Sequence, residues 1–525
     1  MRCARSPVND LMSTSAAPRI RHRRVSDVAF VATSFTLATT YVFSMVSLWR
    51  LPLEYDEAFN FTVVKNLAER WYYGSYGAVW GGGTSVPFDP YITTGPTVIV
   101  PTALIWAATN GTLWVARLVP VAFFGAYIGG VWMLAKRHVD RWQRLGMIGL
   151  PLAFISPIAF EQAAFAPSRL LGETAAAALI MWGLILTSRM QMWWGGLMFG
   201  LAIQSKIVAI APAGVVALAL LLAMRPCTKC VKLRNVVPWL VGVTLPTACF
   251  EACRMLALGW TGYLNNTRHV VAYSRSVLQV GDDDSYDAMS KLASLGNMTS
   301  ASVFAALTIL ITFAIATAIA TGSAARGTSD DHIERGESVG VFNPLAVSTI
   351  SGSASLLLWI LFIQETSGRQ AVLGSLLVLP GLFIFTTKSV PVYGLRESHA
   401  RLFTPFVVIL MTLLIVVDQG RSTILRLYND SVLAEQRHVA EAIVDAGATS
   451  LDVDGWWQHP EFQVLTDLPV ESAENPAELL IFDRIQANYL FGLPDLTNFR
   501  STQLFHDKCA EVVYESPNYV LCRPS

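Results

Sequence analysis

The sequence predicts an all-α polytopic membrane bundle with a small C-terminal α/β domain. Of its 525 residues, 53% are hydrophobic and only 14% are charged, and the mean hydropathy is +0.45. A soluble protein would carry about a quarter charged residues. Several apolar runs approach the ~20 residues that a membrane-spanning helix needs. The runs are continuous rather than alternating, which favours helices over a β-barrel.

Basic residues set the expected orientation of the chain. Arginines precede the first apolar run, and further basic clusters occupy 136–144 and 225–234. Cytoplasmic loops are enriched in Lys and Arg, so each cluster is expected inside, together with the N-terminus. No small-residue cleavage site follows the first run, which predicts a retained helix rather than a signal peptide. The expected location is the inner (plasma) membrane of a bacterium, with the C-terminal domain extracytoplasmic.

About eleven spans follow from this orientation. The first four are expected near 28–49, 114–135, 146–166 and 174–188. The stretch 192–224 is too long for one span and is interrupted by Lys206, so it predicts two short helices that meet there on the outer side. The remaining spans are expected near 236–258, 300–321, 344–363, 371–387 and 402–417.

These spans divide the chain into a cytoplasmic N-terminus (1–27), a first transmembrane module (28–260), a variable transmembrane module (261–421) and a soluble domain (422–525). The soluble domain contains strand-like runs at 479–482 and 519–521, and about 100 residues suffice for a small α/β unit. Cys509 and Cys522 flank a short apolar stretch in this tail. If the tail lies outside the cytoplasm, a disulfide between them is plausible.

The first outer loop, 50–113, predicts helices that lie along the membrane surface. From Glu54 to Trp71, apolar residues recur at helical spacing and leave one polar face. A second apolar piece, 96–108, is interpreted as a surface or re-entrant helix, because a span there would move the basic loop 136–144 outside. Asp56 and Glu57 follow the first span directly. Acids are costly near hydrocarbon, so the pair predicts a functional site, although acids also favour helix N-termini.

Five short motifs occur in a specific order: Asp56-Glu57, Thr94-Gly95-Pro96-Thr97, Ala116-Arg117-Leu118-Val119-Pro120, Glu173, and the segment from Gly196 to Lys206. This order resembles the GT-C glycosyltransferases. The most similar branch is the protein O-mannosyltransferase and lipid A aminoarabinose transferase group, with its bacterial LPS-modifying relatives. The resemblance covers about 28–260. The turn at 94–97 lacks the basic residue of the family's K-P-P-L turn, and Glu173 stands where Asp is commoner.

The resemblance implies transfer of a sugar from a polyprenyl-phosphate donor to an acceptor hydroxyl outside the cytoplasm, with inversion. Asp56 is the expected general base, because a carboxylate can take the proton that the attacking hydroxyl loses. Glu57 is expected to orient the site or bind the acceptor. The leaving phosphate needs cations. The candidates at outer helix ends are Lys206, Arg117, Arg169 and Arg369; supporting or acceptor-binding roles are expected for Glu173, His269 and Tyr72.

Several alternatives stay open. Glu173 could cap its helix, and the arginines could be interfacial side chains that extend to water. Asp56 and Glu173 could hold a divalent metal, but no D-x-D cluster accompanies them, so no cofactor is expected to be required. A transporter or flippase would also contain broken helices, and a lipid-linked polysaccharide ligase or polymerase would use the same carriers. The expected partners are the lipid-linked donor, a glycolipid, glycan or protein acceptor, and membrane lipid, but no nucleic acid.

Overall fold

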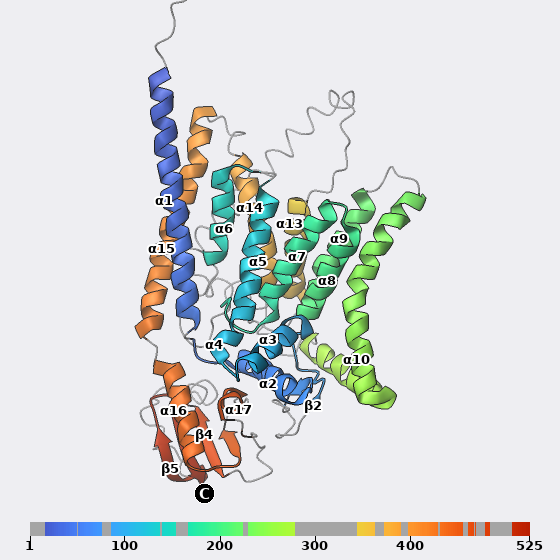
Figure 1. The fold of residues 1–525 in the computed structure, drawn as a ribbon, viewed down its shortest axis with the longest axis vertical. Coiled ribbons are helices and arrows are strands. Elements are labelled where there is room, and N and C mark those ends of the chain that lie inside the picture. The colour runs from blue at the N-terminus through green and yellow to red at the C-terminus, as the bar shows by residue number, and fades with distance from the viewer. Residues whose placement is uncertain are drawn as a thin grey trace, which may run out of the picture.

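The protein is largely helical, and the computed structural model shows a long helical bundle with a small mixed domain at one end (Figure 1). The residues that the structure describes are 16–49, 51–75, 86–136, 139–153, 166–223, 229–278, 344–362, 372–389, 397–428, 431–454, 460–466, 468, 478–483 and 507–525. The span expected at 300–321 lies outside them.

The bundle helices within these ranges are α1 (Ala16–Trp49), α5 (Leu118–Ala135), α6 (Arg141–Ala153), α7 (Gly172–Ser188), α8 (Met192–Ser205), α9 (Ile210–Ala223), α10 (Lys229–Leu278), α13 (Pro344–Phe362), α14 (Val372–Ser389) and α15 (Glu397–Tyr428). Four helical segments are long and apolar enough to cross a membrane: Ser26–Trp49, Leu113–Ala135, Val236–Ala272 and Thr404–Ile424. Shorter apolar helices accompany them, including α7 and α14. The chain is therefore an integral membrane protein, and the number of spans stays a prediction.

Small residues and buried amides hold the bundle together. The backbones of α8 and α10 touch, because a Cβ on Gly196 would lie 2.0 Å from the Trp239 carbonyl oxygen. Such close approach is the usual way in which membrane helices pack. Gln419 on α15 joins three helices: its Oε1 accepts from Ser44 Oγ on α1 at 3.0 Å, and its Nε2 donates to Leu152 O on α6 at 3.1 Å. A buried amide satisfied on both sides fixes the register of its neighbours.

Short helices lie across one end of the bundle (Figure 1). They are α2 (Tyr55–Arg70), α3 (Pro96–Ala108) and α4 (Leu113–Ala116), with a two-stranded ribbon of β1 (Gly74–Ser75) and β2 (Val86–Pro87). We call this the α2 end. The helix expected over 54–71 is present as α2. Helix α3 has 13 residues and is therefore only about 20 Å long, too short to span a bilayer.

The C-terminal domain also lies at the α2 end (Figure 1). It contains α16 (Ser431–Asp445), β3 (Leu451–Asp454), α17 (Pro460–Thr466), β4 (Leu479–Asp483), β5 (Cys509–Glu515) and β6 (Tyr519–Pro524). The sheet order is β3-β4-β6-β5, with β3 and β4 parallel and the other pairs antiparallel. A short core of Val439, Ile443, Phe462, Ile481 and Leu521 joins its helices to the sheet. Both strand-like runs in the sequence are strands.

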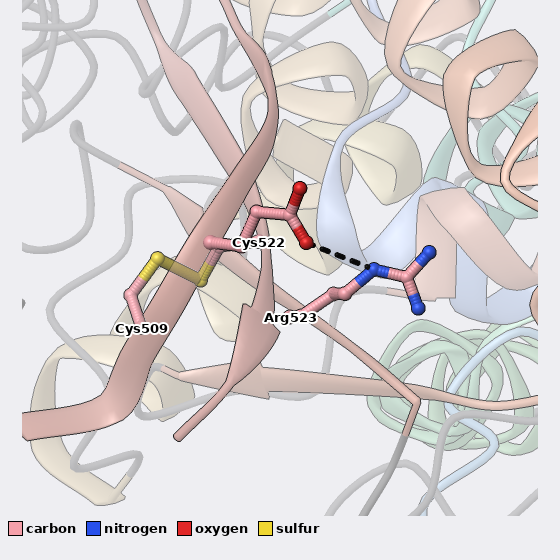
Figure 2. The surroundings of a disulfide bond; sticks show 4 residues. Cys509, Cys522 and Arg523 are labelled. Carbon is pink, nitrogen blue, oxygen red and sulfur yellow. Dashed lines mark ion pairs between the residues drawn. A yellow bond between two sulfur atoms is a disulfide. The ribbon is translucent and has the colours of Figure 1, made fainter.

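A disulfide joins Cys509 and Cys522 across the β5–β6 pair (Figure 2). Their Cα atoms are 5.7 Å apart, and Cys522, on the inner strand β6, is fully buried. The neighbouring Arg523 Nε lies 3.4 Å from Glu511 Oε2 on the same strand pair. The crosslink therefore ties the edge strand β5 to the rest of the domain.

We expect non-reducing peptide mapping of native membranes to recover Cys509 and Cys522 in one crosslinked peptide. Replacing both by Ala should lower the stability of the C-terminal domain by about 2–3 kcal/mol, because a short loop in the unfolded chain is no longer closed. The exposed thiols of Cys249 and Cys253 provide the control, since replacing them should leave the crosslink intact. Free thiols at both 509 and 522 would contradict the prediction.

Candidate functional site

Four separate segments meet at the α2 end: the first turns of α2, the turn at 94–97, the segment 168–173, and the break between α8 and α9. Asn60 connects three of them. Its Nδ2 donates to Thr94 Oγ1 at 3.0 Å and to Leu170 O at 2.8 Å. Asp56 stands four residues before Asn60 and therefore on the same face of α2. This face of α2 is directed at the other segments, and Asp56 remains partly exposed on it.

Glu57 has a different environment from Asp56. It is fully buried, and its carboxylate receives two hydrogen bonds from Arg117, one from Nε at 2.8 Å and one from Nη2 at 2.6 Å. Arg117 is 1% exposed. This is the bidentate geometry in which an arginine binds a carboxylate most strongly. The Glu57 carboxylate is thus enclosed, and it holds the Arg117 guanidinium in one orientation.

The rest of the Arg117 guanidinium binds main-chain carbonyls. Its Nη1 donates to Trp49 O at 3.0 Å and to Leu51 O at 2.8 Å, while Nη2 makes a longer contact of 3.5 Å with Pro52 O. All five N–H groups of Arg117 are thus in use. The role of Arg117 in binding the donor phosphate stays a prediction; in the structure its side chain binds Glu57 and the segment that leads into α2.

Arg169 differs from Arg117 in having donor nitrogens without a hydrogen-bond partner. It is 2% exposed, and its Nη1 pairs with Glu54 Oε2, two residues before Asp56. Its Nε and Nη2 are buried and have no hydrogen-bond partner among the described residues. A buried N–H without a partner costs about 1–3 kcal/mol, so such groups are uncommon unless something binds them. Arg169 therefore presents two donor nitrogens, Nε and Nη2, beside the first turn of α2.

Lys206 lies at the break between α8 and α9, as the sequence predicts. It has an extended conformation (φ −154°, ψ 123°), followed by a short 3-10 turn, Ile207–Ala209. Its Nζ lies 3.0 Å from Glu173 Oε1 in the first turn of α7, and both residues are 4% exposed. An acid at that position favours the N-terminus of α7 as well. The ion pair offsets much of the cost of burying either charge.

Two glycines allow the chain to approach this break. Gly95 donates its N–H to Ser205 O at 3.1 Å, and a Cβ on Gly95 would lie 1.8 Å from Gln204 O. A Cβ on Gly172 would lie 2.1 Å from Ser205 O. No side chain fits at either position. The Gly95 of the Thr-Gly-Pro-Thr turn, which departs from the family pattern, is thus required by direct backbone contact.

The remaining predicted residues lie apart from this group. Tyr72 is half-buried just beyond the end of α2, about 24 Å along the helix axis from Asp56. His269 is exposed on the second half of α10, after the bend at Gly259 (φ +66°). Both residues therefore stand outside the first turns of α2, where Asp56 lies. Arg369 lies outside the described residues.

Asp89, another acid of the first outer loop, is buried and hydrogen-bonded to its own loop. It is 5% exposed, accepts a hydrogen bond from Ser75 Oγ, and accepts the Tyr91 N–H at 2.9 Å. Burial raises the pKa of its carboxyl, against the opposite effect of these hydrogen bonds. Asp89 thus fixes the turn that leads from β2 toward Thr94. Within the part of the chain that the structure describes, no three His, Cys, Asp or Glu side chains gather as a metal site.

Sequence reasoning missed three members of this end of the molecule: Glu54, Asn60 and Ser168. Ser168 Oγ donates to Leu48 O at 3.1 Å, which adds another contact to the segment before α2. A helical projection from Asp56 would have found Asn60, because it falls one turn later on the same face. Glu54 and Ser168 act across more than a hundred positions in sequence, and no local pattern marks such pairs.

The comparisons with known proteins bear on this architecture. Comparison of the sequence with protein-family models finds no match, and comparison with curated proteins finds none either. The structure is similar to that of ArnT from Cupriavidus metallidurans in the apo state, with a TM-score of 0.60, 13% identity, and coverage of 93% of this chain and 97% of that chain. The same protein bound to undecaprenyl phosphate gives a TM-score of 0.58 at 14% identity, with the same coverage.

An oligosaccharyltransferase from Archaeoglobus fulgidus is less similar, with a TM-score of 0.47, 11% identity, and coverage of 88% of this chain and 70% of that chain. ArnT and this oligosaccharyltransferase are both membrane glycosyltransferases of the GT-C superfamily. At 13% identity a likeness establishes the fold alone. The chain has the fold of ArnT over nearly its whole length, and the resemblance in its motifs is confirmed at that level.

Proposed function

We propose that this protein is a glycosyltransferase that moves a sugar from a polyprenyl-phosphate donor to an acceptor hydroxyl, on the extracytoplasmic face of the membrane. The observation that carries the proposal is that the α2 end contains both a partly exposed acid, Asp56, and a buried arginine, Arg169, whose Nε and Nη2 have no partner among the described residues. A base and an anion-binding group are the two things this reaction needs. The fold shared with ArnT, and the binding of undecaprenyl phosphate by ArnT, support the choice of donor.

In the proposed reaction, Asp56 takes the proton of the acceptor hydroxyl while the hydroxyl oxygen attacks the anomeric carbon. The bond from that carbon to the phosphate oxygen breaks, and the phosphate leaves with the electron pair. A single displacement of this kind inverts the anomeric centre. Arg169 meets the growing charge on the phosphate with the N–H groups of Nε and Nη2, and Lys206 adds a second positive charge at the helix break. Such preorganised donors stabilise the transition state more than the ground state.

Glu57 and Arg117 take positioning roles in this proposal. Together they hold the segment 49–57, so that Asp56 meets the acceptor in a fixed geometry. No step requires a metal or other cofactor. Transport is the principal alternative, and it differs in one requirement: a transferase consumes its donor in detergent, whereas a transporter needs a sealed vesicle. The donor and acceptor classes can be tested together by mass spectrometry of envelope glycolipids from a deletion strain.

We expect Asp56→Asn to lower turnover at least about a hundredfold, because Asn keeps the shape of the side chain and cannot take a proton. Thermal stability should change much less than turnover, since Asp56 is partly exposed and Asn is close to Asp in shape. Donor consumption in detergent and melting temperature can be measured on the same preparation. Glu69→Gln, at the exposed far end of α2, is the matched control and should be fully active. More than about half of wild-type turnover in Asp56→Asn would falsify the assignment of the base.

Arg169→Lys keeps the positive charge beside Glu54 but removes the Nε and Nη2 donors. We therefore expect turnover to fall about ten- to a hundredfold, because lysine cannot reproduce the planar fork of arginine at an anion site. The comparison is Arg117→Lys, which breaks the bidentate bond to buried Glu57 and should chiefly lower the melting temperature. Equal stability losses in both variants, with full turnover in Arg169→Lys, would show that Arg169 is structural too.

Lys206→Met should have two separable effects. Loss of the cation should raise KM for the donor, and Glu173 would be left buried without its partner, which costs about 3–5 kcal/mol. The double variant Lys206→Met with Glu173→Gln removes both charges and should regain most of the stability. If Lys206 binds the donor phosphate, the double variant keeps the raised KM. A double variant with wild-type donor kinetics would show that the ion pair serves only the fold.

A further inference from the structure

The C-terminal domain contacts the α2 end through apolar packing of Val464 on α17, and it binds the main chain before α2 through one amide. Gln436, on α16, is 2% exposed. Its Oε1 accepts the Leu53 N–H at 3.0 Å, and its Nε2 donates to the Leu53 carbonyl oxygen at 3.1 Å. One side chain thus satisfies both backbone groups of one residue, as a neighbouring strand would. Leu53 stands three residues before Asp56.

Gln436 is itself held from behind. Its Nε2 also lies 3.3 Å from Tyr519 Oη, and the Tyr519 ring packs edge-on against Phe462 at 5.4 Å in the core of the domain. The preceding residue, Glu435, accepts two hydrogen bonds of 2.7 Å from Asn518, in the turn before β6. The Gln436 amide is therefore held in a fixed position relative to strand β6 by these contacts of α16.

Leu53 is the last point of a segment that is otherwise held from the membrane bundle. Arg117 binds the carbonyls of Trp49, Leu51 and Pro52 and then the carboxylate of Glu57, so it passes over the main chain of Leu53. Leu53 is 3% exposed, so its N–H and C=O have no access to bulk water. The next residue, Glu54, accepts the Ala58 N–H at 2.8 Å and begins α2. The direction in which α2 starts thus depends on how Leu53 is held.

We propose that Gln436 is a positioning residue for the transfer reaction: through the main chain of Leu53, the C-terminal domain sets where Asp56 lies. The inference rests on the proposed function, in which Asp56 is the base. It assigns the C-terminal domain a part in turnover, in addition to any part in binding or stability. Gln436 touches no substrate and acts only through the backbone.

A purely structural contact would make a different prediction. If Gln436 only fastens the domain, its loss lowers stability and leaves the kinetics of the folded protein unchanged. If it positions Asp56, its loss lowers kcat with little change in donor KM, because donor binding depends on other residues while the geometry of proton transfer is lost. A displacement of about 1 Å at a reacting group can reduce turnover about a hundredfold.

Gln436→Leu tests this, and Gln419→Leu is the matched control. Gln419 is equally buried (1% exposed) and also accepts one hydrogen bond and donates another, but it joins α1, α6 and α15. We expect Gln436→Leu to lower kcat about ten- to a hundredfold and to speed hydrogen exchange in peptides covering 51–57. Gln419→Leu should do neither. Identical kcat and exchange in the two variants would overturn the inference.

Gln436→Glu gives a second test within a single folded protein. The ionised Glu would face the Leu53 carbonyl oxygen, so burial and repulsion should raise its pKa above the usual value of about 4.3. The protonated acid can donate to that oxygen and accept the N–H, as Gln does. The kcat of the variant relative to wild type should therefore be low near pH 8 and recover as the pH falls toward about 6. A flat ratio with wild-type kcat would overturn the inference.

Running Asp56→Asn in the same assay separates the two proposals. If Asp56→Asn is inactive and the Gln436 variants keep wild-type kcat, only the positioning role of Gln436 is overturned. Full activity of Asp56→Asn sinks the proposed base, and with it the catalytic meaning of the Gln436 contact. Supporting results are an inactive Asp56→Asn, a kcat-selective loss in Gln436→Leu, and recovery of Gln436→Glu at lower pH.

Discussion

The buried ion pair between Glu57 and Arg117 is the interaction on which the rest of the site depends. Two fully buried charges are costly to bring out of water, and they persist only when every donor and acceptor is satisfied. Here the guanidinium divides its five N–H groups between the carboxylate and three carbonyls of 49–52. The pair therefore stabilises a non-helical segment that would otherwise leave buried carbonyls without partners. The chain between the end of α1 and the start of α2 is thereby held in one conformation.

The fold was largely predictable because the signals for its helices and strands lie in short, continuous stretches of sequence. Hydropathy indicated the apolar helices that the structure describes, and the short apolar runs at 479–482 and 519–521 indicated strands β4 and β6. Lys206 predicted the break between α8 and α9, because a cation inside an apolar stretch needs a reason to be there. The site was predictable only in part. Most acids and cations of the α2 end were found, with the exception of Glu54, but their pairing was not. The partners Glu57–Arg117 and Glu173–Lys206 come from distant segments, and sequence spacing does not encode which charges meet.

Arg117 and Glu57 are both enclosed because each binds the other. Motif order draws attention to charged residues near the membrane, and it cannot tell whether a charge faces a substrate or another charge. Exposure and unused hydrogen-bond capacity do distinguish them. Arg117 has no N–H to spare, whereas Arg169 has Nε and Nη2 buried without partners among the described residues. Two arginines at the same end of the bundle thus differ in how many of their donor nitrogens have a partner.

The adjacent acids Asp56 and Glu57 show why one sequence motif can supply two different functions. Consecutive residues on a helix point about 100° apart. If Glu57 is directed inward at Arg117, then Asp56 must point along the face that Asn60 shares, toward Thr94 and Leu170. The buried acid fixes the rotation of α2 about its axis, and that rotation decides where the partly exposed acid lies. An exchange of the two roles would require α2 to turn by about a quarter of a revolution, which the bidentate bond to Arg117 and the amide contact at Leu53 both prevent.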